Sequence, residues 1–138
     1  MFDEIEIYEN KDHFFYKKGN SLEEQSIDVP DLPGVYYIYR LANGRVDLVY
    51  IGKSGSILQS GNLVEQMLRS SIINMQDGMK RQEYFDEKMD AENIDGLDIY
   101  WYVTMDKNHN DLPEYIAGML MQTYFDVHGK LPPWNKSF

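Results

Sequence analysis

Two tyrosines stand beside glycines in segments that read as β-strands. Tyr36 closes Gly34-Val35-Tyr36, and Tyr50 opens Tyr50-Ile51-Gly52-Lys53. Tyrosine and lysine are both side chains that enzymes use for proton transfer. The chain has 11 tyrosines, and most strand tyrosines only pack, but the flanking glycines and a shared hairpin mark these two as candidates for chemistry. Lys53 alone would be a solvated charge, and Gly34 and Gly52 alone would indicate close approach of two backbones.

Other kinds of site find little support. Cysteine is absent, which excludes disulfides, thiolate metal sites and a cysteine nucleophile. The three histidines, His13, His109 and His128, are scattered without metal-ligand spacing. The oxygen-rich stretch 106–111 lacks the glycine and final glutamate of an EF-hand loop, so a solvated turn is favoured. No glycine-rich phosphate loop precedes a helix.

The strand pattern predicts a hairpin and one later strand. Residues 34–40 are β-branched and aromatic, Asn43-Gly44 is a strong turn signal, and residues 46–51 return as the partner strand. Apolar and more polar residues then alternate over 97–105, which predicts a strand with one buried face.

Helices frame these strands. An apolar stripe predicts a helix over about 62–75, and residues 80–93 read as an exposed helix. A last helix is expected to begin with Asp111 as N-cap and Pro113 in its first turn. Residues 1–33 read as a leader packed on the domain, with a short strand around 5–8. The fold class is therefore α+β: a small antiparallel sheet of about three strands flanked by helices.

The paired motifs, their order and their hairpin context resemble the GIY-YIG nuclease superfamily. A helix follows the second motif, a strand comes later, and a final helix leads to Pro133-Trp134-Asn135, where the family has an asparagine after a proline-containing loop. The resemblance spans roughly residues 33–136 and implies a GIY-YIG-like domain over 34–138. Members of the family cut phosphodiester bonds.

The resemblance implies a site and a cofactor. Phosphodiester hydrolysis must activate water, neutralise the phosphate and stabilise the leaving oxygen. The family's two tyrosines and lysine match Tyr36, Tyr50 and Lys53, and its bracing asparagine matches Asn135. In the family an arginine of the first helix holds the phosphate, and a glutamate of the last helix binds Mg²⁺ or Mn²⁺, a Lewis acid.

Those last two residues are missing at the matching positions. Ser71 stands where the arginine is expected, with Arg69 as the substitute if the register slips. Ala117 stands where the glutamate is expected, and Glu114, one turn upstream, is the candidate metal ligand. Its position three residues after Asp111 equally fits a capping box. Loss of both groups would reduce the rate of hydrolysis on the order of 10³-fold or more.

The charge balance separates the functional hypotheses. With 13 Lys+Arg against 23 Asp+Glu the net charge is -10, so bulk charge does not favour DNA. Four basic residues could still form a local positive patch near the site: Arg40, Arg45, Lys53 and Arg69.

The first hypothesis is a GIY-YIG-type nuclease domain acting on DNA, with impaired catalysis. The alternative is a non-catalytic protein- or nucleotide-binding module on the same fold. In a third hypothesis, the affinity for DNA comes from a protein partner or an additional DNA-binding subunit. No membrane-spanning run or signal peptide is apparent, and a cytoplasmic location is expected.

Overall fold

The computed structural model describes residues 2–64 and 67–138, and its centre is an antiparallel sheet of four strands. In spatial order the strands are β1 (Lys11–Tyr16), β8 (Gly96–Val103), β2 (Gly34–Ala42) and β3 (Arg45–Lys53). Two short strand pairs lie outside this sheet: β4 (Ser56–Ile57) with β5 (Leu63–Val64), and β6 (Met75–Gln76) with β7 (Met79–Lys80). The α+β class is confirmed, and the sheet has one strand more than expected.

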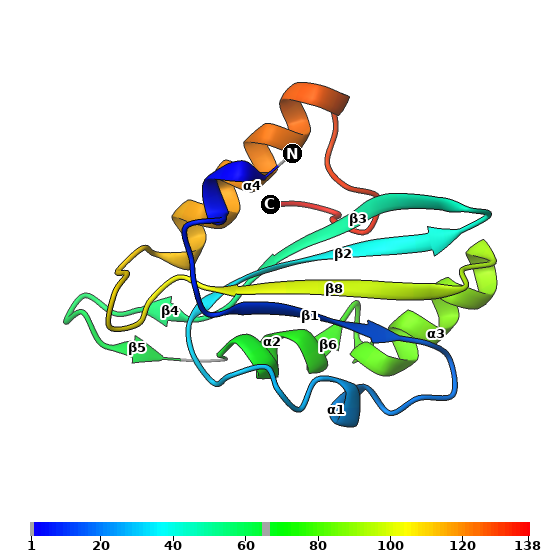
Figure 1. The fold of residues 1–138 in the computed structure, drawn as a ribbon, viewed down its shortest axis with the longest axis horizontal. Coiled ribbons are helices and arrows are strands. Elements are labelled where there is room, and N and C mark those ends of the chain that lie inside the picture. The colour runs from blue at the N-terminus through cyan, green and yellow to red at the C-terminus, as the bar shows by residue number, and fades with distance from the viewer. Residues whose placement is uncertain (1, 65–66) are drawn as a thin grey trace.

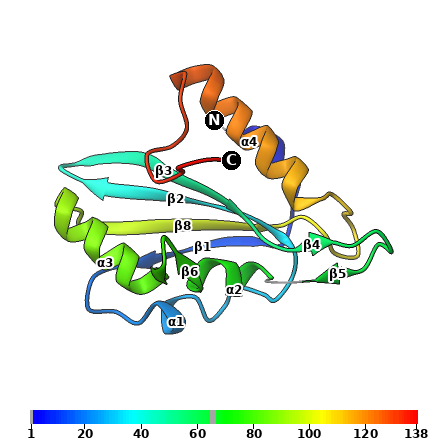
Figure 2. The same cartoon turned by 180° about the vertical axis from the view of Figure 1, so that it is seen from behind.

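Helices cover both faces of the sheet (Figure 1). One face carries α4 (Pro113–His128) and a 3₁₀ turn, η1 (Asp3–Ile5). The opposite face carries α1 (Leu22–Gln25), α2 (Leu68–Ile73) and α3 (Arg81–Glu92). Figure 2 shows the same arrangement from behind. Within residues 2–64 and 67–138, none of these helices has the length and apolar character needed to cross a membrane.

Alternation along the strands gives the sheet an apolar core on each side. Tyr36 and Ile38 of β2 point to the side of α2 and α3, where they pack with Trp101 of β8. Val35 and Tyr37 point to the side of α4. Because a strand residue changes face at every step, the two tyrosines of Tyr36-Tyr37 serve different cores.

The β2–β3 hairpin forms as predicted. Asn43 and Gly44 adopt positive φ angles of 54° and 72°, the left-handed conformation that a tight hairpin turn requires. The register shifts once, between Ile38 and Tyr39, so this long hairpin contains an irregularity of the bulge type. The sequence pattern was sufficient to predict this hairpin because the turn residues and the strand residues both favour it.

The leader differs from its prediction. No strand forms around residues 5–8: Ile5 ends η1, and Ile5 and Tyr8 are buried in the core beside α4. The leader's strand is β1 instead, which pairs with β8 and is mostly exposed. An edge strand of this kind has little hydrophobic alternation, so its sequence gives a weak signal.

Two helix boundaries were also wrong. The helix expected over 62–75 is reduced to α2; residues 63–64 form β5, and residues 65–66 lie outside the described residues. Helix α4 has Leu112 as its N-cap residue, with no side-chain capping bond. Asp111 does not cap, because its carboxylate accepts a hydrogen bond of 2.6 Å from the Tyr8 hydroxyl. The capping-box interpretation of Glu114 is therefore wrong.

Both outer edges of the sheet have local hydrogen-bond partners. On β3, the Val49 carbonyl accepts a bond of 2.9 Å from the Trp134 backbone N–H, so the C-terminal segment runs beside this strand. On β1, the His13 backbone N–H donates to the Asp12 carboxylate over 2.8 Å. These contacts reduce the number of free backbone groups that an exposed edge would offer to another chain.

Gly34 is required for close contact between β2 and β8, which gives a test of the fold. A Cβ atom at this position would lie 2.1 Å from the Tyr102 carbonyl oxygen, so Gly34→Ala must move backbone. We expect it to lower the free energy of unfolding by about 1–3 kcal/mol, measured by urea denaturation. Gly96→Ala is the matched control, since its Cβ would meet nothing closer than 3.6 Å. Equal losses in the two variants would contradict this packing.

Candidate functional site

The hairpin places Tyr36 and Tyr50 on the same face of the sheet. Tyr36 is paired with Gly52, and Tyr50 with Ile38, so the two tyrosines are diagonal neighbours with ring centroids 6.0 Å apart. A Cβ atom on Gly52 would lie 2.3 Å from Cζ of Tyr36, so the glycine makes room for the Tyr36 ring. The two sequence motifs therefore lie side by side in the hairpin, and their tyrosine side chains are neighbours.

Arg81, the first residue of α3, lies over this tyrosine pair. Its guanidinium carbon is 4.8 Å from the centre of the Tyr50 ring, 5.7 Å from that of Tyr36 and 5.5 Å from that of Phe85. Its Nε donates to Gln76 over 2.6 Å, and its Nη1 donates to the Ile72 carbonyl over 3.0 Å. Only 2% of the residue is exposed. The guanidinium is therefore held rigidly by α2, β6 and the hairpin.

The charge of Arg81 has no carboxylate partner. Among the described residues, no Asp or Glu forms an ion pair with it, and none of its hydrogen bonds to them uses Nη2. Burial opposes the charged form, but the Tyr36 and Tyr50 phenols outweigh this effect and raise the pKa of Arg81 above its ordinary value. The site therefore contains a buried permanent cation whose neighbouring side chains, Gln76 and the tyrosines, carry no formal charge.

Tyr50 is a neutral phenol at physiological pH. Burial raises its pKa to about 12, Tyr36 beside it raises the pKa further, and Arg81 only partly opposes the shift. In this state the hydroxyl can donate a hydrogen bond to an anion, but it does not act as a ready base at neutral pH.

Ser71 and Asn135 connect the surrounding segments to β3. The Ser71 hydroxyl donates to the Lys53 carbonyl over 2.9 Å, which ties α2 to the end of β3. The Asn135 side chain makes two bonds with the Ile51 backbone, one in each direction and each 3.0 Å long. Asn135 thus braces the strand next to Tyr50, as the sequence resemblance implies.

Lys53 lies at the outer side of the site. Its ammonium is 3.4 Å from the Glu114 carboxylate and 5.1 Å from the centre of the Phe138 ring. The Glu114 side chain is 70% exposed, so this ion pair is worth little, on the order of 0–1 kcal/mol. A stronger anion could take the place of Glu114 at Lys53.

These groups line one cavity of about 300 Å³. Four of the predicted site residues line it: Tyr36, Tyr50, Lys53 and Asn135. Ser71, which stands where the resemblance implies an arginine, also lines it. Two cationic side chains, Lys53 and Arg81, line it, and no Asp or Glu side chain of the described residues does. The complete lining is Tyr36, Tyr50, Ile51, Gly52, Lys53, Ser71, Met75, Arg81, Asn135, Ser137 and Phe138.

Arg69 is not brought to the cavity. Its guanidinium donates to the backbone carbonyls of Glu23 and Ser26, at 2.9 and 3.2 Å, and so fastens α2 to the leader. Arg81 is the arginine at the site, and it was not predicted because it begins the second predicted helix, whereas the resemblance implies an arginine of the first. The prediction of an exposed helix over 80–93 was also wrong, because Tyr84, Phe85 and Met89 of α3 are buried together with Arg81.

The residues present do not fit the metal ion that the resemblance implies. Ala117 is fully buried in the core beneath α4, where it offers no ligand. Glu114 is engaged by Lys53 and does not line the cavity. Among residues 2–64 and 67–138, no cluster of three His, Asp or Glu side chains could hold an ion.

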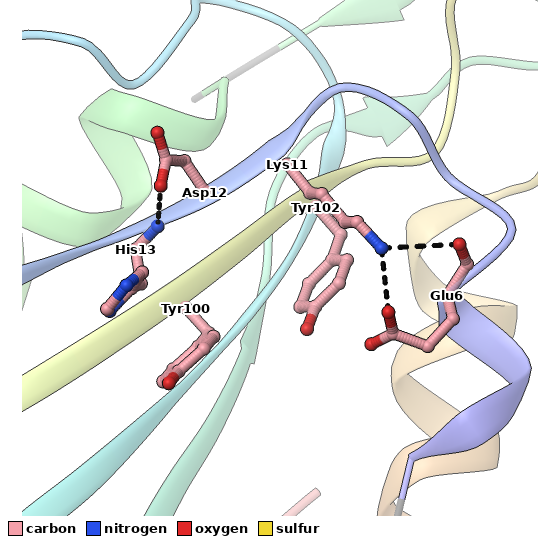
Figure 3. A pocket seen from close by; sticks show the side chains of 6 residues that line it. All are labelled: Glu6, Lys11, Asp12, His13, Tyr100 and Tyr102. Carbon is pink, nitrogen blue, oxygen red and sulfur yellow. Dashed lines mark hydrogen bonds and ion pairs between the residues drawn. The ribbon is translucent and has the colours of Figure 1, made fainter.

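A second cavity, of about 270 Å³, lies over β1 and β8 (Figure 3). Its one lysine, Lys11, pairs with Glu6 over 2.7 Å, and the His13 ring hydrogen-bonds over 2.8 Å to Asp98, which lies outside the lining. The His13 ring also stacks on Tyr100, with centroids 4.6 Å apart. Because these partners satisfy each other, this cavity is a weaker candidate for an anion than the one at Arg81.

No family model, curated protein or solved structure matches the chain. The relation to GIY-YIG nucleases therefore remains a prediction from the sequence motifs.

The protonation of Tyr50 gives a pH-dependent prediction. Tyrosine in an unfolded chain ionises near pH 10, whereas burial raises the pKa of Tyr50 to about 12 in the folded protein. The resulting stability is complete below about pH 10 and is lost as the pH rises through about 12. Tyr50→Phe should therefore make the free energy of unfolding fall less steeply over this interval. The exposed Tyr115→Phe is the control, and identical slopes for all three proteins would refute the assignment.

Proposed function

We propose that this chain is a GIY-YIG-type domain whose cavity binds a phosphate group of a nucleotide or nucleic-acid strand, with impaired capacity for hydrolysis. One observation carries the proposal: Arg81 and Lys53 line a cavity to which no Asp or Glu side chain of the described residues contributes. A cationic cavity in a chain with net charge -10 is a local exception to the overall charge.

The energetics of Arg81 favour an anionic ligand. Removing a charge from water costs several kcal/mol unless partners compensate. In Arg81 the compensation comes from carbonyl oxygens, Gln76 and aromatic rings, which carry no formal charge. A phosphate dianion or diester would supply the missing negative charge, and charge-assisted hydrogen bonds to guanidinium are among the strongest that proteins make.

The other cavity residues extend this recognition. The neutral Tyr50 hydroxyl can donate to a second phosphate oxygen, and the Lys53 ammonium can approach the ligand when it leaves Glu114. Asn135 fixes β3, which carries both Tyr50 and Lys53. Binding and orientation of a phosphate therefore need no residue beyond those already in place.

The same geometry supports impaired hydrolysis. Ala117 is buried among apolar side chains, and Glu114 lies beside Lys53 outside the cavity. With Tyr50 neutral, the cavity offers no evident base for activating water at pH 7. We therefore favour the binding module over the active nuclease.

The charge of -10 bears on partners and location. It would repel a long polyanion, so we propose that a protein partner or an additional DNA-binding subunit supplies affinity for any DNA substrate. We propose a cytoplasmic location, with which a chain free of cysteine is compatible.

The binding proposal is tested with ribose 5-phosphate, titrated into the protein and followed by NMR chemical shifts. We expect one site at the cavity, and Lys53→Gln and Arg81→Gln should each weaken binding about ten-fold or more, since hydrogen bonds to charged groups contribute about 1.5–3 kcal/mol. Lys53→Gln is the decisive variant, because Lys53 is half-exposed and its loss leaves the core intact.

Two controls match these changes. Lys107→Gln removes an exposed lysine far along the chain from the cavity residues, and Arg69→Gln removes an arginine that also binds backbone carbonyls. Both should retain wild-type affinity. Absence of binding, or equal weakening in Lys107→Gln and Lys53→Gln, would refute the proposal.

An active nuclease is the second candidate, favoured by the gathering of Tyr36, Tyr50, Lys53 and Asn135 around one cavity. It is tested by incubating supercoiled plasmid and branched DNA with the protein and Mg²⁺ or Mn²⁺. Our proposal expects no cleavage above background. Cleavage that Tyr50→Phe and Glu114→Gln each abolish would instead establish the nuclease; cleavage that survives both would indicate a contaminant.

A further inference from the structure

The cavity at Arg81 has two chemically different parts. Its inner part is polar and cationic, formed by Arg81, Tyr50 and the neighbouring hydroxyls. Its outer part carries two large apolar side chains, Met75 and Phe138, which are 56% and 59% exposed. A phosphate group alone would not interact with these two side chains.

Phe138 is held in place although it is exposed. One side of the residue meets the Lys53 ammonium, 5.1 Å from the ring centre, and another meets α4, where a Cβ on Gly118 would lie 4.0 Å from Cε2 of Phe138. The segment before it is anchored by Asn135 on Ile51 and by Lys136, whose ammonium is 3.2 Å from Asp77. The ring therefore presents a positioned aromatic surface at the mouth of the cavity.

Exposed aromatic rings beside cationic groups are the usual means of binding unpaired bases. A base stacked on an aromatic side chain contributes about 1–3 kcal/mol, and this holds for every base because each has a π face. A methionine side chain can add an adaptable apolar contact to the bound base. Bases inside a duplex already have both faces covered, so only an unpaired or terminal nucleotide can use such a surface.

We propose that Phe138 stacks on the base of an unpaired nucleotide whose phosphate occupies the cavity at Arg81 and Lys53, with Met75 as a further apolar group of the same cavity. The ligand class is thus a free nucleotide or an unpaired nucleotide of a strand, as opposed to the interior of a duplex. This inference rests on the proposed function, because it requires the phosphate site. The charge of -10 agrees with it, since one nucleotide presents far less negative charge than a duplex.

The test compares adenosine 5′-monophosphate with ribose 5-phosphate, which share the phosphate and the sugar and differ in the base. Each is titrated into the full chain, with Kd measured by NMR. Adenosine 5′-monophosphate should bind about five-fold more tightly or better. Phe138→Ala should bring the ratio of the two Kd values close to one, and this ratio is the readout because Phe138 also lines the cavity and contacts Lys53. Phe138→Leu, which keeps apolar area but loses the aromatic face, should remove most of the preference for adenosine 5′-monophosphate.

Phe125→Ala is the matched control, because Phe125 is an exposed phenylalanine of α4 that does not line the cavity. It should keep the wild-type preference. If ribose 5-phosphate binds and the base adds nothing, or if Phe138→Ala weakens both ligands equally, the stacking inference fails and the phosphate site stands. If neither ligand binds, the proposed function fails and the inference fails with it.

Discussion

The buried guanidinium of Arg81 is the interaction on which the site depends. It joins the carbonyl end of α2, the side chain of Gln76 and the faces of two tyrosines that come from different strands. A cation in this position stabilises the packing of α2 and α3 against the hairpin, and it also creates an excess of positive charge where the chain is otherwise acidic. The same group therefore links these elements and supplies the positive charge on which the proposed binding of an anion depends.

The hairpin was predictable because its local signals agree with its surroundings. Asn43-Gly44 selects the turn, the β-branched and aromatic residues form the strands, and Gly52 leaves the space that the Tyr36 ring fills. A segment can be predicted from its sequence when its local conformational preference agrees with its tertiary packing. The structure also brings Tyr36, Tyr50, Lys53 and Asn135 to one cavity. Three of them belong to the hairpin, and the tail that carries Asn135 is restrained by Pro132 and Pro133.

The rest depended on tertiary contacts that no local pattern records. Asp111 looked like a helix cap, but Tyr8, 103 positions away in the chain, takes its carboxylate. Arg69 and Arg81 have the same side chain, and only the fold decides that one binds the leader while the other lies over the tyrosines. β1 was missed because an edge strand exposes most of its side chains and shows no clear alternation.

The C-terminal segment 134–138 both covers the outer edge of β3 and forms part of the cavity wall. Trp134 and Asn135 occupy the outer edge of β3, and Phe138 forms the rim of the cavity shortly afterwards. An uncovered β3 would present unpaired N–H and C=O groups, the kind of edge from which chains self-associate. The same segment therefore covers an edge of the sheet and forms part of the cavity wall, and a change that loosens it would expose the edge to self-association at the same time as it opens the cavity.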